Sequence, residues 1–447
     1  MILGNLNINI SKFLLAISSM SSLMDCDIAH HNYRVAYISY LIAREISFSN
    51  EFLHNIIISG LLHDIGLLLF HHKEDLNLVK NSTREDIKRI HFHAELGYEL
   101  LRNIPNLTKA AQIIRYHHYT YPEIIKMKAP FSSIIIHLAD RLDVFLSSKI
   151  DFREPYYKNY GNYWKLLEIS RKFLIKSKKH FSEKLINILL NKILNKEAFW
   201  YEYLNEEALK DSLTFILSNF ERKVPFEIFE NMSQTLAYII DFKSPFTATH
   251  SSGVAQTAAT LASLMNFTTP DLQKIKIAGL LHDIGKVAIP LEILEKPGRL
   301  STEEIGVMKS HVFFTYKILS TINIDRSIVS WASYHHEHLD GNGYPFKLDA
   351  KHLCLGCRIM AVADIFTALM EDRPYKKQLS YKEALEIIDK MVSANKLDAK
   401  VVNTLKNNLR KIDYERKKAQ KEARIMYDRL RNIEQKFFER KQVKSFN

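Results

Sequence analysis

Seven histidine and aspartate residues in the second half of this 447-residue chain have side chains of the kind that hold metal ions in enzymes. Imidazole and carboxylate ligands together suit iron, manganese or zinc. One ion takes about four to six ligands, so the set is too rich for a single ion and fits two ions that share a carboxylate. The candidates are His250, His282, Asp283, His311, His335, His336 and Asp364.

Asp283 is the natural bridge between two such ions because it stands in the middle of the set. We expect one ion to be held by His250, His282, Asp283 and Asp364. The other would be held by Asp283, His311, His335 and His336. Two neighbouring ions lower the pKa of a bound water and clamp a phosphate for in-line attack. The ligand set therefore predicts hydrolysis of a phosphoester.

The same series of residue types occurs in the first half of the chain. The first histidine and the His-Asp pair are 32 residues apart in both halves, and the next histidine and the His-His pair are 24 residues apart in both. Two equal intervals between matching residue types are not expected by chance, so we infer a duplicated domain. The first copy therefore offers a second candidate metal site, formed by His31, His63, Asp64, His93, His117, His118 and Asp140.

Helices are expected to position both sets. Glycine and proline are scarce, at 13 and 11 residues, which favours long helices over turn-rich β structure. Apolar and small residues before the second His-Asp pair recur at helical spacing, at Ile275, Ala278 and Gly279. The prediction is an all-α protein with an N-terminal domain and linker helices over residues 1–220, a second domain over 221–412 and a basic C-terminal helix over 413–447.

The C-terminal segment carries an apolar seam with alternating spacings of four and three residues, which is a heptad pattern. Its members are Ala419, Ala423, Met426, Leu430, Ile433 and Phe437. We favour an amphipathic helix that packs on its own domain. The alternative is a coiled coil that joins two copies of the chain in a homodimer.

Cationic residues accompany the second ligand set. Lys286 follows Asp283 by three residues, on the same face of a helix. Arg373 and Lys376 follow Asp364 closely. Positive charges beside a metal cluster offset the charge of a bound phosphate, so these residues are candidates for contact with an anionic substrate.

Three motifs in the second half resemble the HD-GYP family. They are His282-Asp283-Ile-Gly-Lys286, then His335-His336-Glu-His-Leu-Asp-Gly-Asn-Gly343-Tyr344-Pro, and the Arg-Pro-Tyr string that follows Asp364. The resemblance covers about Ser233 to Leu405, and the extended Gly-Tyr-Pro string separates this family from the wider HD superfamily.

The resemblance implies a bacterial helical domain that hydrolyses cyclic di-GMP to the linear dinucleotide or on to GMP. It implies two divalent metal ions, iron or manganese, on the seven ligands above, with Asp283 and Lys286 as catalytic residues. The substrate-binding residues that it implies are Lys286, Gly343, Tyr344, Arg373 and Lys376.

Three alternatives to this function stay open. The same chemistry could prefer 3′,3′-cyclic GMP-AMP, because the choice of base depends on side chains of the pocket. A non-catalytic, nucleotide-binding signalling scaffold is disfavoured by Lys286, Arg373 and the Gly-Tyr-Pro string. A nucleotide phosphohydrolase of the wider HD superfamily is disfavoured by the same string.

Two residues of the second half depart from the family pattern. Phe246 stands four residues before His250, where members with three metals carry an acidic residue, so we expect two ions. Gly253 stands three residues after His250, where the family tends to have arginine, whereas the first copy has Arg34 at the equivalent position.

The first copy resembles a plain HD domain that has lost its phosphate-facing residues. Leu67 stands where the second copy has Lys286, and the first His-His pair is followed by Tyr119-Thr-Tyr-Pro122 without a glycine string. We favour a regulatory or dimerisation domain that still binds metal. The alternatives are a second enzyme with another substrate and a degenerate domain whose histidines have no role.

The formal net charge of +12 suits an anionic partner, and the resemblance implies a small anionic substrate rather than DNA. The sparse cysteines, Cys26, Cys354 and Cys357, argue for a reducing compartment. The N-terminal residues lack the features of a signal peptide, and charges or histidines break the apolar stretches before the ~20 residues that a membrane helix needs. We therefore expect a cytoplasmic protein without a membrane span.

Overall fold

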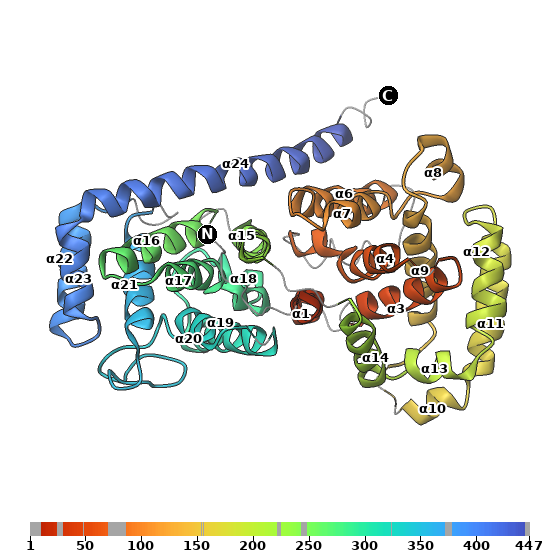
Figure 1. Ribbon diagram of the computed structural model, residues 1–447, viewed down its shortest axis with the longest axis horizontal. Helices are drawn as coiled ribbons and strands as arrows, with labels where there is room; N and C mark the ends of the chain where they lie inside the picture. Colours follow the sequence, from red (N-terminus) through yellow and green to blue (C-terminus); the bar gives the residue numbers. More distant parts are fainter. Residues whose placement is uncertain are drawn as a thin grey trace. The chain divides into compact units, whose positions relative to one another are not determined.

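The computed structural model describes residues 10–24, 30–47, 49–69, 86–152, 154, 156–220, 225–242, 248–322, 324–371 and 378–442. Helices dominate these residues, and the one β feature among them is an isolated bridge between Asp340 and Asp349 (Figure 1). The all-α class and the tandem helical domains predicted from the sequence are thereby confirmed.

The chain divides into two compact units, one over residues 10–222 and the other from residue 223 onward. The helices of the first unit are α1 (Ile10–Met24), α3 (His31–Arg44), α4 (Asn50–Leu62), η1 (Ile65–Leu69), α6 (Asp86–Leu101), α7 (Thr108–Arg115), α8 (Tyr121–Met127), α9 (Ser132–Ser147), α10 (Tyr156–Tyr160), α11 (Tyr163–Lys176), α12 (Glu183–Ile188), η2 (Leu189–Ile193), α13 (Glu197–Tyr203) and α14 (Glu206–Ser218).

The helices of the second unit are α15 (Phe226–Phe242), α16 (His250–Leu264), α17 (Thr269–Leu281), η3 (Ile284–Ala288), α18 (Leu291–Leu294), α19 (Thr302–Ile322), α20 (Arg326–Ser333), α21 (Leu355–Leu369), α22 (Tyr381–Ser393), α23 (Ala399–Asn407) and α24 (Leu409–Gln442).

The repeated histidines and aspartates lie within or directly beside six helical elements of each unit, which follow in the same order. In the first unit they are α3, α4, η1, α6, α7 and α9, and in the second they are α16, α17, η3, α19, α20 and α21. Each His-Asp pair lies between an α-helix and a short 3₁₀ helix, since His63 ends α4 and His282 ends α17. The internal repeat of the sequence is thus also a repeat of structure.

Glycines in equivalent positions let the repeated elements approach each other closely. A Cβ at Gly279 would lie 2.4 Å from the Cα of Ala255 on α16, and a Cβ at Gly60 would lie 2.5 Å from the Cα of Ala36 on α3. Real side chains do not tolerate such distances, so only glycine allows these two helix crossings. The first crossing brings His250 and His282 to the same region of the second unit.

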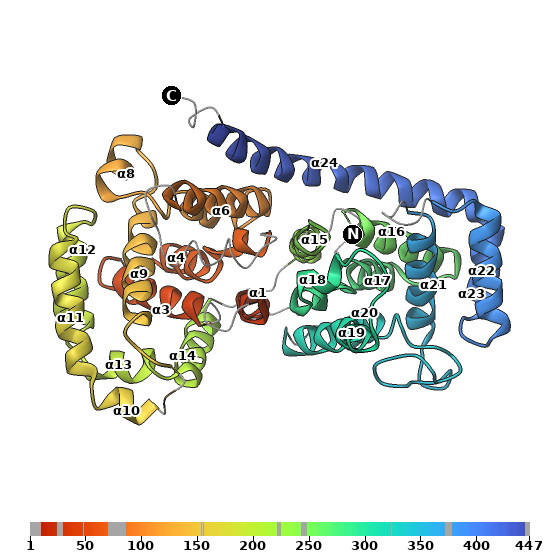
Figure 2. The same ribbon diagram turned by 180° about the vertical axis from the view of Figure 1, so that it is seen from behind.

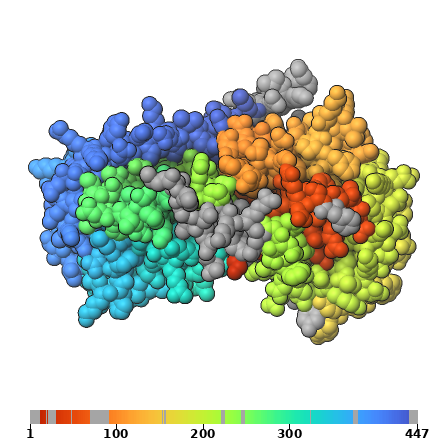
Figure 3. All heavy atoms as spheres, in the orientation of Figure 1, coloured from red at the N-terminus to blue at the C-terminus, as the bar shows by residue number. Residues whose placement is uncertain are grey.

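The C-terminal helix α24 packs along α16 of its own unit, as Figures 1 and 2 show. In the space-filling view its blue atoms lie against the green atoms of the same unit (Figure 3). Ala423 and Leu430 of the predicted seam are buried there, whereas the side chain of Phe437 lies outside the described part. Packing within the unit therefore buries the centre of the seam, as we favoured, without requiring a second chain.

One helical stretch, Asn50–Leu69, is long and apolar enough to cross a membrane by length and composition. Within its most apolar window, 89% is buried inside the protein, and the stretch includes His63 and Asp64 of the first ligand set. These are properties of a core helix.

Candidate metal centre

The seven predicted ligands of the second unit come together at one place. His250 begins α16, His282 and Asp283 join α17 to η3, and His311 lies within α19. His335 and His336 follow α20, and Asp364 lies within α21. Their ligand atoms include two compact groups in which all atoms lie within 4.8 Å of one another: His250, His282 and Asp283, and His311, His335 and His336.

Backbone carbonyls orient three of the histidine rings. The Nδ1 atoms of His282, His311 and His335 donate to the carbonyl oxygens three residues earlier, at 2.8, 2.7 and 2.7 Å. The opposite ring atom, Nε2, is buried in all three and makes no hydrogen bond within the described part of the chain. Rings fixed through Nδ1 with a free inward Nε2 are typical of metal-binding histidines. The donor set therefore fits metal.

The two carboxylates join the two groups. Asp283 places Oδ1 3.3 Å from Nε2 of His311 and Oδ2 3.3 Å from Nε2 of His282, so its two oxygens face different groups. Asp364 places Oδ1 3.2 Å from Nε2 of His250 and Oδ2 3.8 Å from Nδ1 of His336. This is the arrangement expected if Asp283 bridges two ions and Asp364 helps to hold one of them.

The electrostatic environment keeps most ligands in metal-binding forms at neutral pH. Burial and the neighbouring imidazoles hold the pKa of His335 well below its usual range, and burial lowers the pKa of His336 to about 3. Burial opposes ionisation of Asp283, but His282 and Lys286 overcome it and hold the pKa of that carboxyl well below its usual range. His250 and His282 differ, because neighbouring carboxylates outweigh the effect of burial. Glu371 and Asp364 raise the pKa of His250 to about 10, and Asp283 and Asp364 raise the pKa of His282.

Lys286 lies beside the centre, with Nζ 2.5 Å from Oδ2 of Asp283. It is partly exposed, and so is His336, whose side chain is 28% accessible, whereas the other six ligands are buried. The exposed edge of the cluster therefore lies at Lys286 and His336. Arg373, Lys376 and Phe246 lie outside the described residues.

The Gly-Tyr-Pro string folds back onto the His-His pair. The backbone N–H of Tyr344 donates to the carbonyl of His336 at 3.1 Å, and the two rings lie 4.8 Å apart. A Cβ at Gly343 would lie 2.4 Å from the Cα of Glu337, so this approach requires glycine. Gly343 and Tyr344 thus cover the cluster beside its exposed edge.

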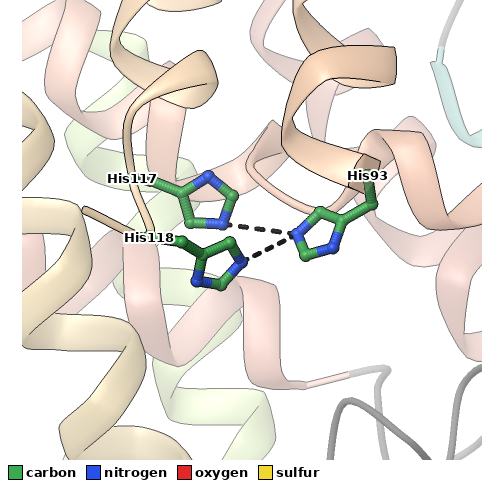
Figure 4. A group of neighbouring side chains, drawn as sticks. All are labelled: His93, His117 and His118. Carbon is green, nitrogen blue, oxygen red and sulfur yellow. Dashed lines mark hydrogen bonds between the residues drawn. The ribbon is translucent and has the colours of Figure 1, made fainter. Parts of the chain in front are cut away.

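The first unit gathers its seven equivalent residues in the same way. Nε2 of His93 lies 3.4 Å from Nε2 of His117 and 3.0 Å from Nε2 of His118, and the three rings point toward one another (Figure 4). Asp64 again faces both groups, with Oδ1 3.2 Å from Nε2 of His93 and Oδ2 3.4 Å from Nε2 of His63. The group is completed by His31, which lies 3.2 Å from His63, and by Asp140, which lies 3.3 Å from His31. This donor set also fits metal.

Both units resemble known proteins. Models of the HD domain match residues 28–144 and residues 234–401. The chain is 31% identical over 416 residues to the 3′3′-cGAMP-specific phosphodiesterase 1 of Vibrio cholerae, an alignment that covers 90% of this chain and 92% of that protein. The chain belongs to the HD-GYP family.

Other relatives match shorter parts of the chain. The cyclic di-GMP phosphodiesterase of Thermotoga maritima is 33% identical over 202 residues, which are 45% of this chain and 51% of that protein. A solved structure of a cyclic GMP-AMP phosphodiesterase of V. cholerae has a TM-score of 0.58 and 20% identity, and covers 90% of this chain and 98% of that one. This last likeness concerns the fold alone.

The sequence analysis missed two carboxylates that support the HD-GYP centre, Glu337 and Glu371. Glu337 accepts hydrogen bonds from the backbone N–H groups of Phe346 and Leu348 at 2.7 and 3.0 Å, and so holds the Gly-Tyr-Pro loop closed. Glu371 lies 2.9 Å from Nδ1 of His250. The position of Glu337 directly after the His-His pair was a usable signal, whereas no spacing in the sequence pointed to Glu371.

Proposed function

We propose that the HD-GYP unit hydrolyses a phosphodiester bond of a cyclic dinucleotide at a two-metal centre. The observation that carries the proposal is the placement of Asp283, whose two oxygens face two separate histidine groups beside Lys286. When bound, two divalent ions supply a water of lowered pKa and a clamp for the phosphate. Iron or manganese suits this mixture of imidazole and carboxylate ligands.

The residues at the exposed edge are proposed to bind different parts of the substrate. Lys286 carries a positive charge next to the carboxylate bridge, where it offsets the charge of the substrate phosphate. The ring of Tyr344 stands beside His336 and offers a flat face for a base or ribose. Arg373 and Lys376 are proposed as further phosphate contacts.

The substrate is a cyclic dinucleotide, and we propose 3′,3′-cyclic GMP-AMP as the preferred one, because the relative that aligns with both HD units is specific for it. Cyclic di-GMP, our preference from the sequence, is the second candidate, supported by relatives that act on it and match 31% and 45% of this chain. Products are the linear dinucleotide, mononucleotides or both.

The test is to load the full chain with Mn²⁺ or Fe²⁺ and to compare 3′,3′-cyclic GMP-AMP, cyclic di-GMP and cyclic di-AMP by chromatography. We expect hydrolysis of the first two, with kcat/KM at least about tenfold higher for the preferred one, a difference of about 1.4 kcal/mol. Hydrolysis of none of the three by metal-loaded protein would contradict the proposal. Faster turnover of cyclic di-GMP would reverse the order of the two candidates.

Lys286→Met is expected to lower kcat/KM by roughly 10²-fold while leaving the bound metal unchanged, because a charge that stabilises the transition state is lost. Lys296→Met is the matched control, since Lys296 pairs with Glu304 and contacts none of the proposed ligands in the described structure. Steady-state kinetics and elemental analysis check this prediction. A fall of less than about threefold would remove Lys286 from the proposed machinery.

For the first unit we propose a metal-binding regulatory domain. Leu67 is buried where the HD-GYP unit has Lys286, and the side chain of His118 is 7% accessible, whereas that of His336 is 28% accessible. Among the described residues, this cluster therefore has neither a lysine at the position of Lys286 nor a histidine as exposed as His336, both of which would favour binding of a dinucleotide phosphate.

A further inference from the structure

His250 is held differently from the other histidines of the HD-GYP centre. Its Nδ1 atom donates to a side-chain carboxylate, Oε2 of Glu371, at 2.9 Å rather than to a backbone carbonyl. Carboxylate partners of this kind fix the ring of a metal-binding histidine and increase its basicity. The orientation of His250 therefore depends on what holds Glu371.

Glu371 is held from the C-terminal helix α24. Its other oxygen, Oε1, accepts from Nε2 of Gln420 at 2.5 Å, and Oε1 of Gln420 accepts from the guanidinium of Arg416 at 2.7 Å. Arg416 in turn donates to Oδ1 of Asp413 at 3.0 and 2.7 Å, and its side chain is only 2% accessible. Three residues on one face of α24 thus form a hydrogen-bonded chain that ends at His250.

In the first unit, His31 is the residue equivalent to His250, and its ring is held without a residue from the C-terminal helix. Nδ1 of His31 lies 2.7 Å from Oδ2 of Asp143, which also accepts from Arg34 at 3.1 Å, while Nε of Arg34 lies 2.6 Å from the other oxygen. Arg34 follows His31 by three residues, and Asp143 follows Asp140 by three. The histidine and its supporting pair therefore come from α3 and α9, and Tyr203 of α13 donates to Oδ1 of Asp143 at 2.6 Å.

Both members of that pair are missing from the HD-GYP unit. The equivalent positions are Gly253, three residues after His250, and Thr367, three residues after Asp364. The space is used by α24, since a Cβ at Gly253 would lie 2.8 Å from Nε2 of Gln420 and 3.0 Å from Cγ2 of Thr367. The departure at Gly253 thus makes room for a residue from the end of the chain.

We infer that α24 is a working part of the HD-GYP centre, in which Gln420, anchored by Arg416, positions Glu371 so that Glu371 orients His250 towards metal. The inference rests on the proposed two-metal function. Gln420 and Glu371 are positioning residues, since neither belongs to the proposed ligand set. Through them, the packing of the C-terminal helix controls how tightly the His250 side of the centre holds its ion.

The test uses the full chain and three variants: Gln420→Met, Glu371→Gln and the double variant. Removal of a partner behind a metal ligand weakens metal affinity by about 10- to 100-fold. We expect each single variant to bind one of its Mn²⁺ ions about tenfold or more weakly, measured by titration and elemental analysis, and to regain turnover at high Mn²⁺. Because the residues act in one chain, the double variant should be no weaker than Glu371→Gln alone.

Gln435→Met is the matched control, because Gln435 is an exposed glutamine on the same helix. Leu430→Ala tests for simple loosening of the helix, since Leu430 is a buried residue of α24 that makes no contact with Glu371 in the described structure. Three results would each overturn the inference. The first is that Gln420→Met binds Mn²⁺ as tightly as Gln435→Met does, and the second is that the effects of the two single variants add in the double variant. The third is that Leu430→Ala loses as much Mn²⁺ affinity as Gln420→Met at equal thermal stability. A wild-type chain that binds no metal would instead contradict the proposed function itself.

Discussion

Asp283→Ala is expected to abolish turnover, with a fall on the order of 10³-fold or more, and to release both metal ions of the HD-GYP unit. The reason is the placement of its carboxylate, whose Oδ1 and Oδ2 each lie 3.3 Å from a histidine of a different group. Asp364, the other carboxylate of the described ligand set, cannot replace it because Asp364 already faces His250 and His336. Chromatographic assays and elemental analysis check this result, which should show about two fewer ions per chain than wild type.

The fold should survive this substitution. Asp283 is buried among imidazoles and Lys286. After its removal the imidazoles can stay neutral and the partly exposed Lys286 can turn to water, so no buried positive charge is left unpaired, and the histidines keep their bonds to backbone carbonyls. Circular dichroism should therefore show the wild-type helix content. Asp389→Ala is the matched control, because Asp389 pairs with Lys406 on the surface. Near-wild-type hydrolysis by Asp283→Ala would refute the shared-carboxylate assignment.

The fold class and the clustering of the candidate ligands could be predicted because both depend on the spacing of residues that are near one another in the sequence. Helix periodicity is local, and a repeated interval of 32 residues marks two helices whose ends must meet. The equivalent glycines at residues 60 and 279 are also recognisable in the sequence, but the close helix crossings that require them are seen only in the structure.

The support behind His250 could not be predicted, because it depends on contacts across 121 residues to Glu371 and on to Gln420. Such contacts follow from the packing of α24, and a heptad seam does not tell whether a helix packs on its own domain or on a second chain. The sequence revealed only the absence of arginine at Gly253. Hydrogen-bond partners of a ligand are chosen by tertiary geometry, whereas the ligands themselves are limited to a few residue types.

The two units are expected to differ sharply when each loses its own His-Asp pair. His282→Ala with Asp283→Ala should inactivate the chain despite an intact first unit. His63→Ala with Asp64→Ala should leave hydrolysis at the HD-GYP centre within about threefold of wild type, although thermal stability, oligomeric state or activation can change. Kinetics with both cyclic dinucleotides and elemental analysis of each double variant make the comparison.

The physical reason lies in charge compensation at the two centres. A phosphate placed at the first cluster would meet the buried Leu67, whereas at the second it meets Lys286, which lies 2.5 Å from Asp283. Poor compensation costs several kcal/mol of transition-state stabilisation, on the order of 10²-fold or more in rate. The His-His pair of the first unit also leads into α8 through Tyr119 and a Thr120 capping box, where the second unit has a glycine-bearing loop. Comparable residual hydrolysis from both double variants would mean two working active sites, and this division between a regulatory and a catalytic unit would be wrong.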